Sequence, residues 1–141
     1  MAYTRVNWEN LPSTNTPVNA TNLNKMDAGI NNLYPTAWTT VTLGSSLSGG
    51  IIRYAKLGNI VIVTIRNLTA SSALTGGTVL AQGLPPSIVV ENFLMSNYTV
   101  TNNDLNCLIA LNTTGVLSIL SDTMYAGNAQ YFAQFMYITN E

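Results

Sequence analysis

A long run of strand-forming residues, interrupted only by Gly58-Asn59, is the feature that most limits how this chain can fold. The run extends from Ile51 to Leu68 and is rich in isoleucine and valine. Because a Gly-Asn pair favours a two-residue turn between antiparallel strands, the run predicts a β-hairpin in which Tyr54 lies opposite Val63. The main domain therefore contains a long antiparallel strand pair.

Both faces of this hairpin carry apolar side chains. The predicted register places Ile52 and Ile65 on one face and Leu57 and Ile60 on the other. A strand pair with one face in water should instead alternate between apolar and polar residues. We therefore expect the hairpin to be covered twice, on one face by its own domain and on the other by a neighbouring subunit.

Further short strands follow from the alternation of β-forming segments with turns, and no helical pattern separates them. The expected strands comprise residues 38–43, 78–81, 93–101, 105–112, 116–120 and 131–139. Short strands at regular spacing are typical of antiparallel two-layered folds. The predicted fold class is therefore mainly β, an antiparallel, jelly-roll-like β-sandwich that forms a head domain over residues 36–141, after an N-terminal segment of residues 1–35.

The N-terminal segment has a different periodicity. Leu23, Met26, Ile30 and Leu33 are spaced as the a and d positions of a coiled coil, which predicts a short helix that stops before Tyr34-Pro35. A helix of about two heptads is marginal by itself in water. We expect these four residues to form an oligomerisation seam; the alternative is a helix that lies across its own head domain.

The composition excludes several classes of partner. Only 8% of the residues are charged, against about 25% in an average protein, so asparagine and threonine must supply much of the polar surface. A net charge of -1 without a cluster of Lys or Arg argues against nucleic-acid binding. No apolar run reaches the roughly 18 residues of a membrane span, and no signal-peptide pattern opens the sequence. We expect synthesis in a cytoplasm without a signal peptide, and no membrane partner.

The absence of histidine removes the commonest general base and the commonest zinc ligand. We expect no catalytic residue, no cofactor and no metal site. A glycosidase is the enzymatic alternative, and it would have to use two of the carboxylates Glu91, Asp104 and Asp122 of the predicted head. Isolated carboxylates in turn contexts more often form turns and solubilise the surface.

What remains is binding chemistry. Aromatic rings beside amides and hydroxyls can stack on sugar rings and form hydrogen bonds with them. The candidate saccharide-binding residues are Trp38, Tyr98, Asp104 and Tyr125; among the tyrosines, Tyr98 and Tyr125 are the most loop-like because they lie near Asn and Gly. Tyrosines in strands more often pack in the core.

The segment from Trp8 to Ile30 resembles one found in tail-fibre and baseplate proteins of phages and prophages of Gram-positive bacteria. In those proteins a Trp, a Thr-Pro and an Asn-rich core lead into a short trimeric helix. The matching positions are Asn19, Ala20, Asn22, Leu23, Asn24, Lys25, Met26 and Ile30. The remainder resembles the heads of these proteins in layout only, with an opening Trp, an aliphatic hairpin, a Leu-Pro turn and an aromatic last strand.

The resemblance implies a homotrimer located at the tail tip of a virion. Its N-terminal segment would dock onto other tail or baseplate proteins, through a short trimeric coiled coil, and its head would meet a host cell-surface saccharide. Three weak sites on one trimer, repeated over a tail tip, would give firm adhesion. We therefore expect a receptor-binding tail protein; the alternative is a purely structural baseplate or fibre component that binds no glycan.

Overall fold

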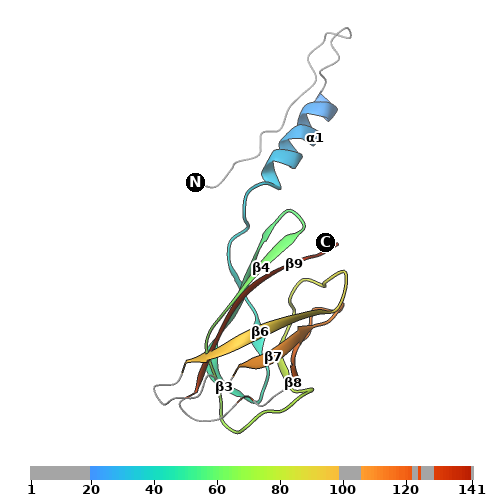
Figure 1. Cartoon of the computed structure of the whole chain (residues 1–141). Coiled ribbons are helices and arrows are strands. Elements are labelled where there is room, and N and C mark those ends of the chain that lie inside the picture. Colours follow the sequence, from blue (N-terminus) through green and yellow to red (C-terminus); the bar gives the residue numbers. More distant parts are fainter. Residues whose placement is uncertain (1–19, 99–105, 122–123, 125–128, 141) are drawn as a thin grey trace.

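The computed structural model describes residues 20–98, 106–121, 124 and 129–140. In this part of the chain one helix, α1 (Ala20–Asn31), stands at one end of a head built from nine strands (Figure 1). The strands are β1 (Thr39–Thr40), β2 (Thr42–Leu43), β3 (Leu47–Leu57), β4 (Ile60–Ala70), β5 (Val79–Gln82), β6 (Glu91–Tyr98), β7 (Cys107–Leu111), β8 (Leu117–Ser121) and β9 (Gln130–Ile138).

All neighbouring strands pair antiparallel, in the order β1-β3-β4-β9-β6-β7-β8-β5-β2. Strand β6 changes partner along its length, since Met95 pairs with Cys107 of β7 and Ser96 pairs with Phe132 of β9. It therefore joins two halves of the sheet. We call β1, β3, β4, β9 and the end of β6 sheet A, and the start of β6 with β7, β8, β5 and β2 sheet B.

The chain also passes between the two halves at Val41. Thr40 pairs with Arg53 of β3, and the amide of Val41 still donates to the carbonyl of Ile52 at 2.9 Å. Thr42, the next residue, pairs with Gln82 of β5. The two edges of the sheet are thus consecutive in the sequence, and the sheet is nearly closed.

This arrangement confirms the predicted fold class in part. The head is mainly β and antiparallel, and each predicted strand has a counterpart. The jelly-roll-like sandwich is corrected to one nearly closed sheet, because β6 and the β1–β2 segment each pair with both halves. Strand positions along a sequence do not reveal a strand that changes partner.

The central hairpin has the predicted register. Tyr54 lies opposite Val63, and the turn is Gly58-Asn59, with Gly58 at a positive φ of 56°. Pairing shifts beyond Ile51, where a β-bulge brings Gly50 so near to β4 that a Cβ would lie 2.6 Å from a backbone atom of Leu68. Glycine is required there by both its φ of 109° and this close approach.

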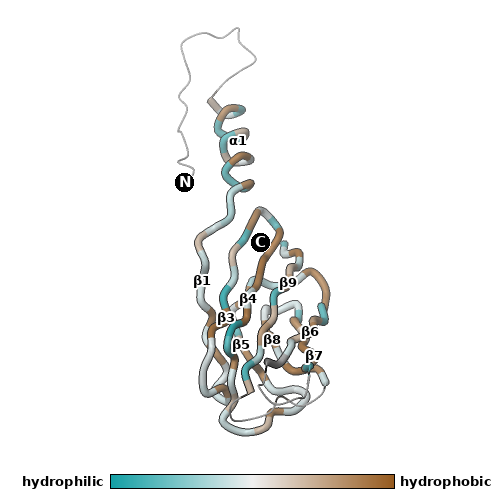
Figure 2. The backbone as a smooth tube through the Cα atoms, turned by 60° about the vertical axis from the view of Figure 1, so that its left-hand side comes forward, coloured by the Kyte–Doolittle hydropathy of each residue, from teal (hydrophilic) through white to brown (hydrophobic). Residues whose placement is uncertain are grey.

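The core lies between sheets A and B. Its largest fully buried side chain is that of Tyr131, and Phe93 of β6 stacks on Phe135 of β9 with ring centroids 3.8 Å apart. The buried Tyr137 hydroxyl donates to the carbonyl of Pro85 at 2.6 Å. Figure 2 shows hydrophobic stretches concentrated along the strands of the head, whereas α1 alternates between hydrophobic and hydrophilic residues.

The helix ends earlier than the heptad spacing predicts. The amide of Asn32 still bonds to Ala28, but those of Leu33 and Tyr34 bond only three residues back, to Ile30 and Asn31. This tightening is a usual helix ending, and the residue before Pro35 is restricted from the helical region. Leu33 therefore lies just beyond α1, while the other three predicted seam residues lie within it.

Candidate functional site

The head has two distinct ends. At one end the chain leaving α1 is tied to the central hairpin, since the amide of Thr36 donates to the carbonyl of Lys56 at 2.7 Å and the Thr36 hydroxyl accepts from the Lys56 amide at 2.8 Å. The end of β9 reaches the same place, where the Thr139 amide bonds to the carbonyl of Asn59. The β2–β3 turn and the β4–β5 loop lie at the opposite end (Figure 1).

The surface opposite α1 is rich in uncharged hydroxyl groups. Among the described residues of its two connections and the adjoining strand ends these are Ser45, Ser46, Ser48, Thr69, Ser71, Ser72, Thr75 and Thr78. The Ser48 hydroxyl donates to that of Thr69 at 3.1 Å across β3 and β4. No charged residue occurs in residues 44–48 or 69–78. This end therefore offers neutral donors and acceptors.

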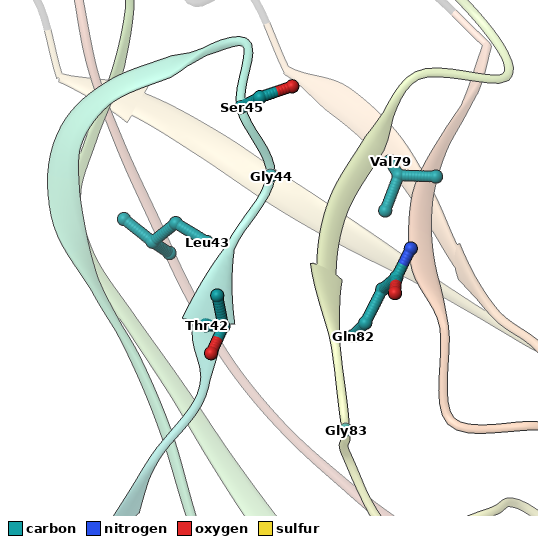
Figure 3. A pocket seen from close by; sticks show the side chains of 7 residues that line it. All are labelled: Thr42, Leu43, Gly44, Ser45, Val79, Gln82 and Gly83. Atoms are coloured by element: carbon teal, nitrogen blue, oxygen red, sulfur yellow. The ribbon is translucent and has the colours of Figure 1, made fainter.

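A surface hollow of about 580 Å³ lies where β2 and β5 meet. It is lined by Thr42, Leu43, Gly44, Ser45, Val79, Gln82 and Gly83, with the β2 residues on one side and the β5 residues on the other (Figure 3). We call it the β2–β5 hollow. Its lining combines hydroxyl, amide and aliphatic groups and contains no ionisable side chain.

A β-bulge shapes the β5 side of this hollow. Val79 and Gln82 both line it, although residues three apart on a regular strand point to opposite faces. The pairing of β5 with β8 shifts between Val79 and Ala81, and both Leu80 and Ala81 are fully buried. The bulge thus turns two consecutive side chains into the core and leaves Val79 and Gln82 on the same outer side, as Figure 3 shows.

The outer face of sheet A is a second notable surface. Ala55, Ile62 and Met136 lie in one row across β3, β4 and β9, and Leu57, Ile60 and Ile138 lie in the next. Met136 is 65% exposed, and Ile60 and Ile138 are also exposed. These six residues define what we call the apolar face of sheet A.

Trp38 adjoins this face beside Arg53. The Arg53 guanidinium carbon lies 4.7 Å from the centroid of the Trp38 ring, and its Nε donates to the Thr64 hydroxyl at 3.2 Å. The indole is 45% exposed. One ring face is therefore occupied by a cation, which leaves less aromatic surface for a sugar.

The two predicted saccharide residues that the structure describes, Trp38 and Tyr98, lie at different places in the fold. Trp38 precedes the edge strand β1, whereas Tyr98 ends β6, and strands β3, β4 and β9 lie between them. The described part of Tyr98 is its backbone, which pairs with Gln130. Asp104 and Tyr125 lie outside the described residues. The β2–β5 hollow was not predicted, and the sequence signal for it is weak because its residues are ordinary threonine, serine and glutamine.

The predicted oligomerisation residues are uncovered in the single chain. Met26 is 64% exposed and Leu33 72%, Ile30 is exposed, and Leu23 is half-buried. The buried side chain of α1 is instead that of Asp27. Packing these exposed apolar side chains against a partner surface would stabilise the helix.

Groups that could serve enzymes or metals are sparse in the described chain. Glu91 is half-buried at the start of β6, opposite Leu111, while Asp104 and Asp122 lie outside the described residues. No group of three or more His, Cys, Asp or Glu side chains gathers in the part that the structure describes. The described residues also include no helix that is long and apolar enough to cross a membrane.

Comparison with known proteins gives a similarity of fold. No protein-family model matches the sequence, and no curated protein sequence matches it. Among solved structures, the chain is similar to the head domain of phage bIL170, which was described in a study asking whether the receptor-binding domains of lactococcal phages share a fold. The TM-score is 0.56 at 13% sequence identity, over 72% of this chain and 96% of that one. The nearly closed β-sheet domain of this chain thus shares its fold with that head domain.

Proposed function

We propose that this chain is a receptor-binding protein of a phage or prophage tail, which works as a homotrimer and binds a saccharide of the host cell surface. The fold shared with the head domain of phage bIL170 carries this proposal. The motif of residues 19–30 supports it from a different part of the chain, because the similar structure concerns the head and the motif precedes it.

Two uncovered apolar surfaces support self-association. The apolar face of sheet A exposes aliphatic side chains, and the stripe of α1 exposes Met26 and Ile30. Large exposed apolar patches are uncommon on monomeric proteins and often mark contacts with other chains. A trimer would cover both surfaces at once, the stripe in a short coiled coil and the sheet face between heads.

The chemistry of the other surfaces supports a neutral saccharide as the ligand. Within the described chain, residues 44–48 and 69–78 at the end opposite α1 and the lining of the β2–β5 hollow present hydroxyl and amide groups without charge. Such groups match the donors and acceptors of sugar hydroxyls. Their position away from α1 fits a molecule whose N-terminal segment docks onto other tail or baseplate proteins while its head meets the host.

We propose binding rather than catalysis. Two other functions are open to the same fold, a purely structural baseplate or fibre component and a cell-wall glycan hydrolase. The structural component would trimerise but bind no glycan. The hydrolase would need an acid and a partner carboxylate across a cleft.

The test uses purified cell walls from a panel of Gram-positive bacteria. Fluorescently labelled full-length protein is sedimented with each wall preparation, and the supernatant is analysed for released sugars. The proposal predicts co-sedimentation with the walls of some strains and no released product. Co-sedimentation with no strain would favour the structural component, and product release would favour the hydrolase.

A further inference from the structure

We propose that the β2–β5 hollow is a binding site for a neutral sugar unit. This inference rests on the proposed function and adds the place of binding. Trp38, the one predicted saccharide-binding residue whose side chain the structure describes, does not line this hollow.

Paired polar groups give the hollow its recognition chemistry. Thr42 of β2 and Gln82 of β5 are direct cross-strand partners, so their side chains lie side by side on one face of the sheet. Both side chains are exposed. A hydroxyl and a carboxamide each donate and accept hydrogen bonds, which suits two neighbouring sugar hydroxyls. Ser45 adds a third such group and Val79 an aliphatic surface for the C–H face of a ring.

The backbone around the hollow is fixed. A Cβ on Gly44 would contact the carbonyl oxygen of Val79, so glycine allows the two chains to approach, and the Gly44 amide donates to the carbonyl of Leu80 at 2.8 Å. Gly83 has a φ of 88°, a conformation that other residues rarely adopt. With the bulge at Leu80, these constraints fix the backbone that carries Gln82 and Val79 before a ligand arrives, which removes the entropic cost of ordering that backbone on binding.

The charge distribution selects a neutral ligand. None of the seven lining residues is ionisable, and the described charged residues of the head, Arg53, Lys56, Arg66 and Glu91, do not line the hollow. A phosphate-bearing or uronic-acid polymer would find no cation there. The volume of about 580 Å³ lies within the roughly 300–1,000 Å³ of small-ligand sites. Binding to this site should therefore change little with salt.

The experiment is a titration of the full-length protein with glucose, galactose, rhamnose and N-acetylglucosamine, followed by amide chemical shifts in NMR. It is repeated with Gln82→Ala and Thr42→Val, which remove the amide and the hydroxyl. The control is Asn92→Ala, which removes an exposed amide of β6, at the far edge of sheet B from β2. Sedimentation with cell walls is measured on the same four proteins.

We expect at least one sugar to shift the amides of residues 42–45 and 79–83. Gln82→Ala and Thr42→Val should each weaken that binding by about threefold to tenfold, as expected for the loss of one hydrogen bond, and Asn92→Ala should leave it unchanged. If the walls are bound but the sugars shift other residues, or the two variants bind like the control, the hollow assignment is wrong and the proposed function stands. If neither sugars nor walls bind, both are wrong.

Discussion

Replacing Tyr137 by phenylalanine removes one hydroxyl from the core and leaves the ring in place. That hydroxyl donates to the carbonyl of Pro85 at 2.6 Å, and Tyr137 is 4% exposed. It ties β9 to the segment between β5 and β6. The change leaves the Pro85 carbonyl without this donor inside the protein, which costs about 1–3 kcal/mol of unfolding free energy.

The measurement is urea denaturation of the full-length protein at one fixed concentration, because association would make stability depend on concentration. For a chain of this size the loss corresponds to a fall of about 3–10 °C in Tm. Tyr54→Phe is the matched control, since Tyr54 is half-buried and no hydrogen bond of its hydroxyl is seen among the described residues. If both variants stay within about 0.5 kcal/mol of the parent, the assigned contribution of the Tyr137 contact is refuted.

Three further changes test other parts of the structure. Gly115→Ala should destabilise the head by at least about 2 kcal/mol, because φ is 77° and the new Cβ would contact the carbonyl of Leu84; an unchanged urea midpoint would contradict this. Met136→Glu should reduce a solution mass of three times 15.2 kDa, measured by light scattering, whereas Leu94→Glu, an equally radical change on sheet B, should not. Glu91→Ala should leave wall binding unchanged. If the parent protein releases sugar from the walls and Glu91→Ala does not, that result would support the hydrolase instead.

The sequence predicts the central hairpin accurately because its determinants are local. Gly58-Asn59 fixes the turn, and the turn fixes the register that pairs Tyr54 with Val63. The second tight turn, between β7 and β8, follows from the same logic, since Gly115 has a positive φ and Asn112 Oδ1 accepts from the amides of Thr114 and Val116. Strand positions follow from the same local signals.

The closure of the sheet could not be predicted because it depends on partners far apart in sequence. Nothing within β6 itself marks Met95 and Ser96 as residues that pair with different strands. Likewise, the transfer from β3 to β5 after Val41 is set by where the edges of the two sheets meet. Alternation along each strand indicates which side is buried, but not which strand lies beside it.

The candidate site was missed for a related reason. The β2–β5 hollow exists because a bulge at Leu80 leaves Val79 and Gln82 on the same side, and that bulge arises from pairing with β8. Strict alternation would have placed the two side chains on opposite faces. Trp38 was predicted from its aromatic character, and the structure gives it Arg53 as a neighbour.

The proposed trimer would also explain why sequence and structure look unusual for a lone domain. Mean hydropathy is +0.22, and several large apolar side chains of sheet A and α1 remain exposed in the single chain. Burial between subunits would remove this surface from water. The low charge content then has a role too, since few charges need to be desolvated when three heads associate.

Binding to isolated wall saccharide is the most direct measurement of the central claim. Polysaccharide is released from the walls of a strain that the protein sediments with, and calorimetry compares it with the remaining peptidoglycan. We predict that the full-length protein binds the released polysaccharide, with little dependence on salt, and not the stripped peptidoglycan. Equal binding to both, or binding to neither, would contradict a saccharide receptor for this protein.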